Sequence, residues 1–233
     1  MKGYSAKQVR DAEAPHLAAG EPLMARAADA LARECVRVLE GEGIAPAHSR
    51  VVVLAGGGNN GGDALYAAAA LAARGARLEV IRTSSRVHEE ALAAALAAGA
   101  RPVESEARRL AALAASADLI IDGILGTGTS ADPRLRGAAR DVVAAIVAAR
   151  PAARVVAVDI PSGIHPDTGD VPEPGAVLRA DVTVTFGGAK AGLLLPPARD
   201  VAGELRVHDI GLAAELEKLT PLVEVPDGEG RPG

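Results

Sequence analysis

From residue 50 onward, short runs of β-branched residues alternate with longer runs of alanine and leucine. The predicted strands cover residues 51–55, 78–81, 119–122, 155–160, 182–186 and 205–210. The predicted helices between the first five strands cover residues 63–74, 88–98, 105–115 and 137–149, and the middle two share one connection. Strands that are apolar on both faces and alternate with helices form parallel sheets covered by helices on each side. The sequence therefore predicts an α/β fold with a mostly parallel central sheet. Its last strand follows a loop and is a candidate antiparallel edge.

The segments before and after this alternation have a different character. Residues 5–19 and 21–40 have the apolar spacing of helices, and Gly41 and Gly43 end the second one. Residues 216–233 end in a stretch rich in proline, glycine and acidic residues, which is typical of a frayed terminus or a linker. A chain of 233 residues is long enough for one well-filled core and short for two. We expect a single domain over 1–233, with leading helices over 1–45, a core over 46–215 and a tail or linker over 216–233.

Composition excludes several classes of protein. Hydrophobic residues make up 49% of the chain and charged residues 24%, so a disordered chain is not expected. The net charge of −5 and the aromatic share of 1% argue against a nucleic-acid partner. The single cysteine, Cys35, excludes an intramolecular disulfide and a cysteine-based zinc site, and favours the cytoplasm. Because the chain has neither an apolar signal core nor 18 uninterrupted apolar residues, we predict that it is neither secreted nor membrane-spanning.

Three loops that follow predicted strands are rich in glycine and in oxygen-bearing side chains. They cover residues 55–63, 122–132 and 159–170. In open parallel sheets, ligands bind beyond the carboxyl ends of the strands. The five glycines of the first loop permit backbone conformations closed to other residues and let a ligand approach the amides. A helix starting near Asp63 would point free N–H groups at an anion such as a pyrophosphate. The plainer interpretation is a tight glycine turn with Asp63 as the N-cap.

The first loop also matches the dinucleotide-binding fingerprint, as Gly56-x-Gly58-x-x-Gly61. This raises an NADP-dependent oxidoreductase as an alternative function, and a non-catalytic nucleotide-binding module as another. The fingerprint requires an acidic residue about 20 residues further on, to hold the ribose hydroxyls. The second predicted strand is followed instead by residues that would suit a 2′-phosphate, namely Arg82, Ser84, Ser85 and Arg86.

Carboxylates end the third and fourth predicted strands. Asp122 and Asp159 could each cap the following loop. Together with the Ser162 hydroxyl and the Asn60 amide, however, they form an oxygen-rich, partly anionic group, which is the ligand set of a hard cation. A cation would also compensate buried carboxylates. Lys190 follows the fifth strand at the same sheet edge, and is equally consistent with a phosphate contact and with a solvated side chain.

Several of these segments resemble one known family. The stretches GGGNNGGDAL, DGILGTGTS, AVDIPSGIHPDTGDV and ADVTVTFGGAKAGLL closely resemble the motifs of the YjeF N-terminal domain family, the NAD(P)H-hydrate epimerases. The resemblance implies a Rossmann-like three-layer αβα sandwich with N-terminal helices packed on it. It also implies a homodimer that interconverts the R and S epimers of NADH and NADPH hydrated at C6 of the nicotinamide ring. Family members are often fused to a C-terminal ribokinase-like dehydratase.

The resemblance also assigns roles to individual residues. It places a potassium ion on Asn60, Asp122 and Ser162. It assigns substrate binding to Asn59, Asn60, Gly61, Gly62, Asp63, Gly126, Thr127, Gly128, Thr129, Ser130, Ala131, Asp132 and Asp159.

Inversion at C6 requires a planar intermediate, so a carboxyl group near the nicotinamide must protonate the leaving hydroxyl and receive a proton when water returns. Asp63 is the first candidate for this catalytic role and Asp159 the second. Both follow strand ends, whereas Asp122 is assigned to the cation.

Overall fold

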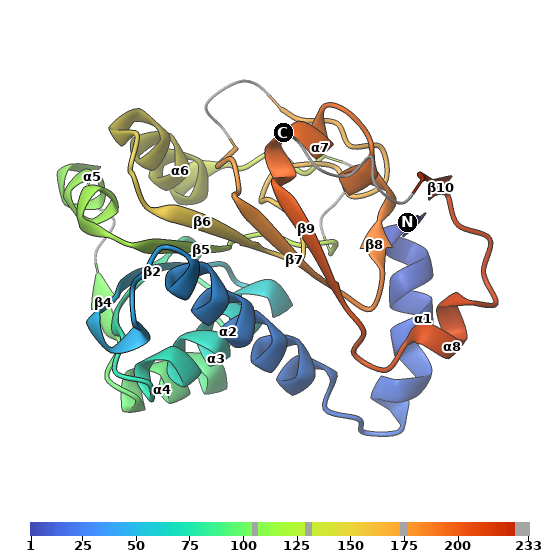
Figure 1. The fold of residues 1–233 in the computed structure, drawn as a ribbon, viewed down its shortest axis with the longest axis horizontal. Coiled ribbons are helices and arrows are strands. Elements are labelled where there is room, and N and C mark those ends of the chain that lie inside the picture. The colour runs from blue at the N-terminus through green and yellow to red at the C-terminus, as the bar shows by residue number, and fades with distance from the viewer. Residues whose placement is uncertain (104–106, 129–131, 173–176, 227–233) are drawn as a thin grey trace.

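The structure, a computed structural model, describes residues 1–103, 107–128, 132–172 and 177–226 (Figure 1). Within these residues, seven parallel strands form the main sheet, in the order β4-β3-β2-β5-β6-β7-β9. The strands are β2 (Arg50–Ala55), β3 (Arg77–Arg82), β4 (Arg101–Val103), β5 (Leu119–Gly123), β6 (Arg154–Val158), β7 (Val182–Phe186) and β9 (Glu204–His208). The predicted antiparallel edge is wrong, because β9 runs parallel to β7. The connection between them includes the 3-10 turn η2 (Ala191–Leu194) and helix α7 (Ala198–Ala202). This connection is long enough to return the chain to the starting end of the sheet, as a parallel neighbour requires.

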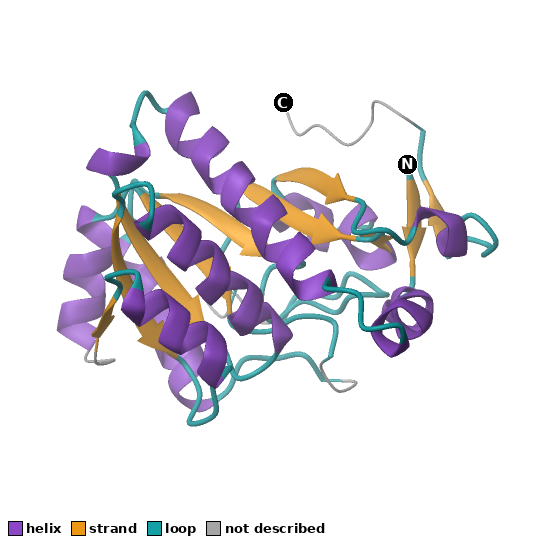
Figure 2. Ribbon diagram, turned by 90° about the horizontal axis from the view of Figure 1, so that it is seen from below, coloured by secondary structure: helices purple, strands orange, loops and turns teal. Residues whose placement is uncertain are grey.

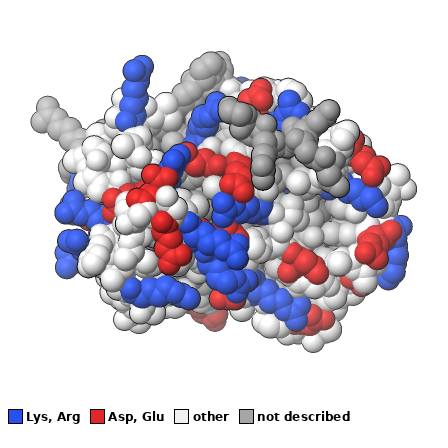
Figure 3. Space-filling view, in the orientation of Figure 1, with Lys and Arg blue, Asp and Glu red and all other residues white. Residues whose placement is uncertain are grey.

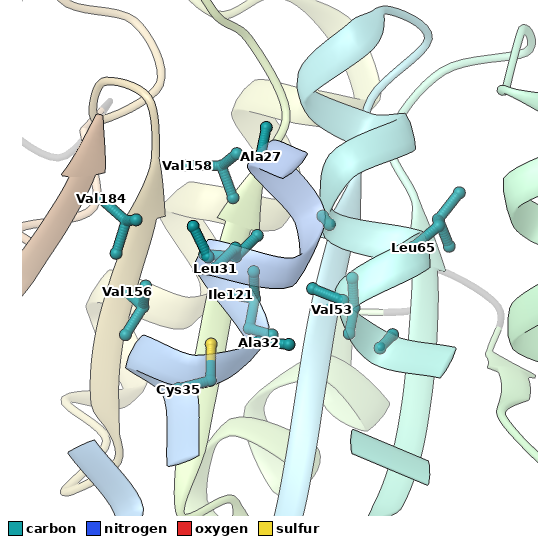
Figure 4. Close-up of a cluster of buried hydrophobic side chains, with 14 of the residues drawn as sticks. Ala27, Leu31, Ala32, Cys35, Val53, Leu65, Ile121, Val156, Val158 and Val184 are labelled. Atoms are coloured by element: carbon teal, nitrogen blue, oxygen red, sulfur yellow. The ribbon is translucent and has the colours of Figure 1, made fainter. Parts of the chain in front are cut away.

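Helices cover both faces of this sheet, which confirms the three predicted layers. One face packs against α2 (Leu23–Gly41), α3 (Asn59–Ala72) and α4 (Glu89–Ala97), and the other against α5 (Ala107–Ser116) and α6 (Gly137–Ala149). Alternate residues of β2 enter the two cores: Val51 and Val53 enter the first, and Val52 and Leu54 the second. Figure 4 shows the small side chains of α2 against the central strands. The core is therefore aliphatic, as a chain with so few aromatic residues requires.

A second, three-stranded sheet joins distant parts of the chain. Strand β1 (Lys2–Tyr4) lies between β8 (Ala189–Lys190), which is parallel to it, and β10 (Val223–Glu224), which is antiparallel. The sequence predicted a loose tail from residue 216, but the described part of that segment pairs with the N-terminus, after the short helix α8 (Ala213–Leu216). The 3-10 turn η1 (Pro46–His48) precedes β2.

Helix α1 (Ala6–Ala18) confirms the first predicted helix. It begins with a capping box, in which the Ser5 side chain accepts from the Gln8 backbone N–H and the Gln8 side chain accepts from the Ser5 N–H. The Ala6 N–H donates to Asp167 Oδ1 at 2.6 Å, which anchors the helix start to the loop after β6. Unlike α2, α1 lies beyond the carboxyl ends of the strands (Figures 1 and 2). It therefore faces the sheet edge where the predicted site lies.

Acidic and basic side chains are interspersed across the face of the molecule drawn in Figure 3. Such a mixture is expected for a chain with 25 basic and 30 acidic residues. None of the described helices combines the length and the apolar character that crossing a lipid bilayer requires.

Candidate active site

A cleft of about 780 Å³ opens where the strands of the main sheet end. All three predicted loops line it, through Gly56–Asn60, Ile124–Gly128 and Asp159. Helix α1 lines it as well, and in Figure 2 the loops gather between the strand ends and α1. The volume is in the range of small-molecule sites, about 300–1,000 Å³. The prediction that these loops meet at one rim is confirmed.

The glycines of the first loop allow the backbone of one loop to lie against the next. A Cβ on Gly56 would lie 1.8 Å from the Ile124 carbonyl oxygen, and a Cβ on Gly61 would lie 2.2 Å from the Gly56 oxygen. None of the loop's five glycines has a positive φ, so the prediction of conformations closed to other residues is wrong. Helix α3 begins at Asn59, with Gly58 as its N-cap, rather than near Asp63. The free N–H groups at its start therefore precede Asp63, which lies one turn inside the helix.

The three predicted cation ligands converge beside the cleft. Ser162 Oγ donates to Asp122 Oδ1 at 2.6 Å and the Ser162 N–H donates to Oδ2 at 2.9 Å. Asn60 Nδ2 donates to the Val158 carbonyl at 2.5 Å and lies 3.4 Å from the Leu125 carbonyl, which Ser162 Oγ also approaches at 3.3 Å. Asp122 and Ser162 are fully buried, whereas Asn60 and Leu125 line the cleft. The three residues and two backbone carbonyls thus form one oxygen-rich cluster, which we call the Asp122 niche.

The Asp122 carboxyl lacks a cationic partner among the described residues. Burial raises its pKa, and hydrogen bonds from Ser162 and from the Ile124 N–H lower it in part. A buried carboxylate without an opposite charge is costly, so the niche suits a hard cation that takes oxygen ligands.

Asp63 lies on the cleft as a buried carboxyl group. Its Oδ1 has no hydrogen-bond partner within the described residues. Burial raises the pKa of this carboxyl well above its usual range, and the negative charges of Asp159 and Glu13 raise it further, while Lys190 opposes them. Asp63 therefore keeps its proton up to a higher pH than an ordinary aspartate does.

Asp159 has a very different environment. Its Oδ1 accepts hydrogen bonds from Lys190 Nζ, from Thr185 Oγ1 at 3.0 Å and from the Phe186 N–H at 3.4 Å. Its backbone has a φ of 67°, which is unusual for a residue other than glycine and turns the side chain toward β7 and β8. Asp159 therefore forms a buried salt bridge with Lys190.

Lys190 itself is 2% exposed and also donates to the Phe186 carbonyl at 2.9 Å. The interpretation of Lys190 as a solvated side chain is wrong, because its ammonium is buried and donates to Asp159, Thr185 and Phe186. Lys190 also lines the cleft, so its contact with a phosphate stays a prediction. Its place is fixed by strand pairing, in which Lys190 lies opposite Tyr4 of β1.

Comparison with known families now identifies the chain. The sequence profile described as "YjeF-related protein N-terminus" matches residues 20–192. The chain belongs to this family. A relative from Clavibacter michiganensis named NAD(P)H-hydrate epimerase is 51% identical over 95% of this chain and 94% of its own length. A relative of the same name from Microbacterium testaceum is 47% identical over 96% of this chain and 84% of its own length.

Two further relatives bear on domain organisation and fold. The bifunctional NAD(P)H-hydrate repair enzyme Nnr of Mycobacterium tuberculosis is 44% identical over 90% of this chain, which spans 41% of that protein. The crystal structure of the yeast protein YNL200c superposes with a TM-score of 0.71 at 22% identity, covering 82% of this chain and 83% of the yeast chain. The yeast structure supports the fold, and the Mycobacterium protein shows that this family domain occurs within longer chains.

The remaining predicted substrate residues of the YjeF-related domain lie in different places. Asn59, Gly126, Thr127, Gly128 and Asp132 line the cleft. Gly61 and Gly62 do not line it, and Gly62 packs under the His88 ring, whose Cδ2 would be 3.0 Å from an added Cβ.

Salt bridges from Arg134 and Arg136 hold Asp132. Hydrogen bonds from Arg134 lower the pKa of the Asp132 carboxyl. The predicted residues Thr129, Ser130 and Ala131 lie outside the described residues. Thr83, Ser84 and Arg86 line the cleft at the end of β3, where the sequence allowed a 2′-phosphate contact.

Sequence reasoning missed the contribution of α1. Arg10 donates to the Thr127 carbonyl at 2.9 Å, and Glu13 lines the same cleft. The apolar spacing of residues 5–19 predicts a helix but does not show that its polar side faces a site. Only the position of α1 beyond the strand ends reveals these two residues.

Proposed function

We propose that this chain is an NAD(P)H-hydrate epimerase, an isomerase of nicotinamide cofactor repair that interconverts the R and S epimers of NADH and NADPH hydrated at C6. The proposal rests on the carboxyl group of Asp63, which is buried, without a hydrogen-bond partner at Oδ1 among the described residues, on a cleft of suitable size at the carboxyl edge of a parallel sheet. Burial raises the pKa of this carboxyl, as a general acid requires. Two relatives that match nearly the whole chain at about half identity carry the same name.

In the proposed reaction, Asp63 donates its proton to the C6 hydroxyl while the lone pair of the ring nitrogen expels water. The C6–O bond breaks, a C6=N double bond forms, and the ring becomes a planar cation. Addition of water to the other face and loss of a proton give the other epimer. General acid catalysis of this kind contributes roughly 10²–10⁴-fold.

Asp159 is less suited to donate a proton, because Lys190, Thr185 and the Phe186 N–H all donate to it. We assign it instead to substrate binding and to electrostatic stabilisation of the cationic ring. Lys190 is then a positioning residue that keeps this carboxylate in place.

Potassium is part of the proposal. Asp122, Ser162 and the Leu125 carbonyl would hold it, and Asn60 would join them by turning its amide oxygen toward the niche. When bound, the ion would compensate the Asp122 charge and tie the loops after β2, β5 and β6 together.

One assay separates the candidate functions. A mixture of the two hydrate epimers is incubated with the protein, with and without potassium, and followed by chromatography. An epimerase returns a distorted mixture to its equilibrium ratio without change in the total. An oxidoreductase leaves the epimer ratio unchanged and, in a parallel incubation with NADPH and a carbonyl acceptor, lowers the nicotinamide absorbance. A binding module raises the melting temperature with the hydrate but leaves the ratio unchanged.

Three further expectations complete the proposal. The homodimer is tested by sedimentation of the purified chain, and the cytoplasmic location by fractionation of the source cells. Whether the native gene product continues into a ribokinase-like dehydratase is tested by the mass of the protein in those cells.

A further inference from the structure

The inner end of the cleft holds more carboxyl groups than the proposed reaction has used. Asp63 comes from α3, Asp159 from the end of β6 and Glu13 from α1, and all three affect one another electrostatically. Lys190 is the cation among them, and Arg10 adds a second positive charge near Glu13. Lys190 is already paired with Asp159. Glu13 and Asp63 are therefore the two carboxyl groups there that no basic side chain pairs with directly.

Glu13 has the features of a group that exchanges protons. It is half-buried on the cleft lining, and its carboxyl makes no hydrogen bond or ion pair within the described part of the chain. Its neighbours on α1 do find partners, since Lys7 pairs with Asp11 and Arg10 donates to Thr127. Burial raises the pKa of Glu13, although Lys190 and Arg10 oppose the rise.

The helix that carries Glu13 is fixed in position. The capping box at Ser5, the contact of Ala6 with Asp167 and the pairing of β1 with β8 hold its N-terminal end. Helix α3, which carries Asp63, packs on a face of the sheet, whereas α1 lies beyond the strand ends (Figures 1 and 2). The two carboxyl groups therefore approach the cleft from different elements of the fold.

Inversion at C6 needs proton exchange on two faces of the ring. The hydroxyl leaves from one face with a proton from an acid, and water must add to the opposite face while a base takes its proton. A single carboxyl group serves one face, so it returns the starting epimer more readily than the other.

We propose that Glu13 is the second catalytic residue, which exchanges protons with water on the ring face opposite to that served by Asp63. This inference rests on the proposed epimerase function. In one direction, Asp63 protonates the leaving hydroxyl and ionised Glu13 takes a proton from the incoming water. In the reverse direction protonated Glu13 is the acid and ionised Asp63 the base. Each inversion exchanges one hydroxyl oxygen for a solvent oxygen, and no oxidant or reductant is needed.

The test uses purified R and S hydrates in ¹⁸O-water, with potassium present and enzyme-free rates subtracted. Chromatography measures inversion, and mass spectrometry measures ¹⁸O in the remaining starting epimer. The variants are Glu13→Gln and Asp63→Asn. The matched control is Asp11→Asn, the same change of charge on the exposed side of α1, which should leave both rates at the wild-type level.

We expect inversion to fall by about 100-fold or more in both catalytic variants. Exchange without inversion should persist for one epimer in Glu13→Gln and for the other epimer in Asp63→Asn. A general distortion of the cleft would not produce this mirrored pattern.

Each other outcome refutes a defined part of the reasoning. If Glu13→Gln inverts the hydrates at the wild-type rate, or if it loses oxygen exchange for both epimers, the role of Glu13 is refuted and the epimerase function stands. Wild-type protein that neither inverts nor exchanges either epimer overturns the proposed function, and the role of Glu13 with it.

Discussion

The pair formed by Asp159 and Lys190 gives a quantitative prediction, because both side chains are buried, with exposures of 9% and 2%. Lys190→Met keeps most of the volume of the stem but leaves Asp159 as a buried carboxylate without its cation. Removing one partner of a buried ion pair costs about 3–5 kcal/mol. A domain of ordinary stability, about 5–15 kcal/mol, would lose a large part of it.

Urea unfolding followed by circular dichroism measures this effect. With a slope of roughly 2–3 kcal/mol per molar urea, the midpoint of Lys190→Met should fall by about 1–2.5 M. The double variant Asp159→Asn/Lys190→Met should recover most of the loss. Asparagine tolerates a positive φ and can accept the bonds that Thr185 and Phe186 donate. If the single variant keeps the wild-type midpoint, or if the double variant is no more stable than the single one, the pair does not have the energetic role derived from its burial.

Three further predictions concern the cleft and the niche beside it. Asp63→Asn should lose about 100-fold or more in epimerisation and stay folded. The pKa of Asp63 is raised in the folded state, so folding takes up a proton at any pH above the unfolded pKa. The free energy of unfolding of the wild type should therefore fall relative to that of Asp63→Asn as the pH rises from about 4. Urea unfolding of both proteins at several pH values measures this difference. Gly56→Ala places a Cβ 1.8 Å from a backbone oxygen and should cost roughly 1–3 kcal/mol or more. Gly58→Ala meets open space, so it should cost only the loss of a favourable N-cap residue, about 0.5–1 kcal/mol; a loss as large as that of Gly56→Ala would refute the packing argument. Ser162→Ala removes a donor to Asp122 and should cost about 1–3 kcal/mol of stability. It should also reduce the rise in melting temperature that potassium causes. If potassium raises the melting temperature of the variant as much as that of the wild type, the Ser162 hydroxyl is not a ligand of the ion.

The strands of the main sheet were predictable where β-branched runs are long and buried on both faces. Val51–Val53 and the runs around Ile120 and Val156 belong to this class. Strand β4 was missed because it is three residues long and contains Pro102, which propensity argues against. Strand β1 was missed because its pairing partners lie almost 190 and 220 residues away. Local patterns carry no information about such contacts.

The site was predictable to the extent that polar residues followed strand ends. Asn60, Asp122 and Ser162 meet because parallel strands bring their carboxyl ends to one edge. The roles of Asp159 and Lys190 could not be predicted, because they depend on a buried contact between residues 31 positions apart that no local pattern indicates. Glu13 was missed because its helix reaches the cleft through tertiary packing alone.

The order β10-β1-β8 has a consequence for how the protein is made. Lys2–Tyr4 form the middle strand, and both of its partners, Ala189–Lys190 and Val223–Glu224, are synthesised much later than it is. The wall of the cleft that carries α1 therefore cannot be anchored until the chain has been synthesised as far as β10. An unfinished chain can build much of the large sheet, but it has no anchored helix with which to close the cleft.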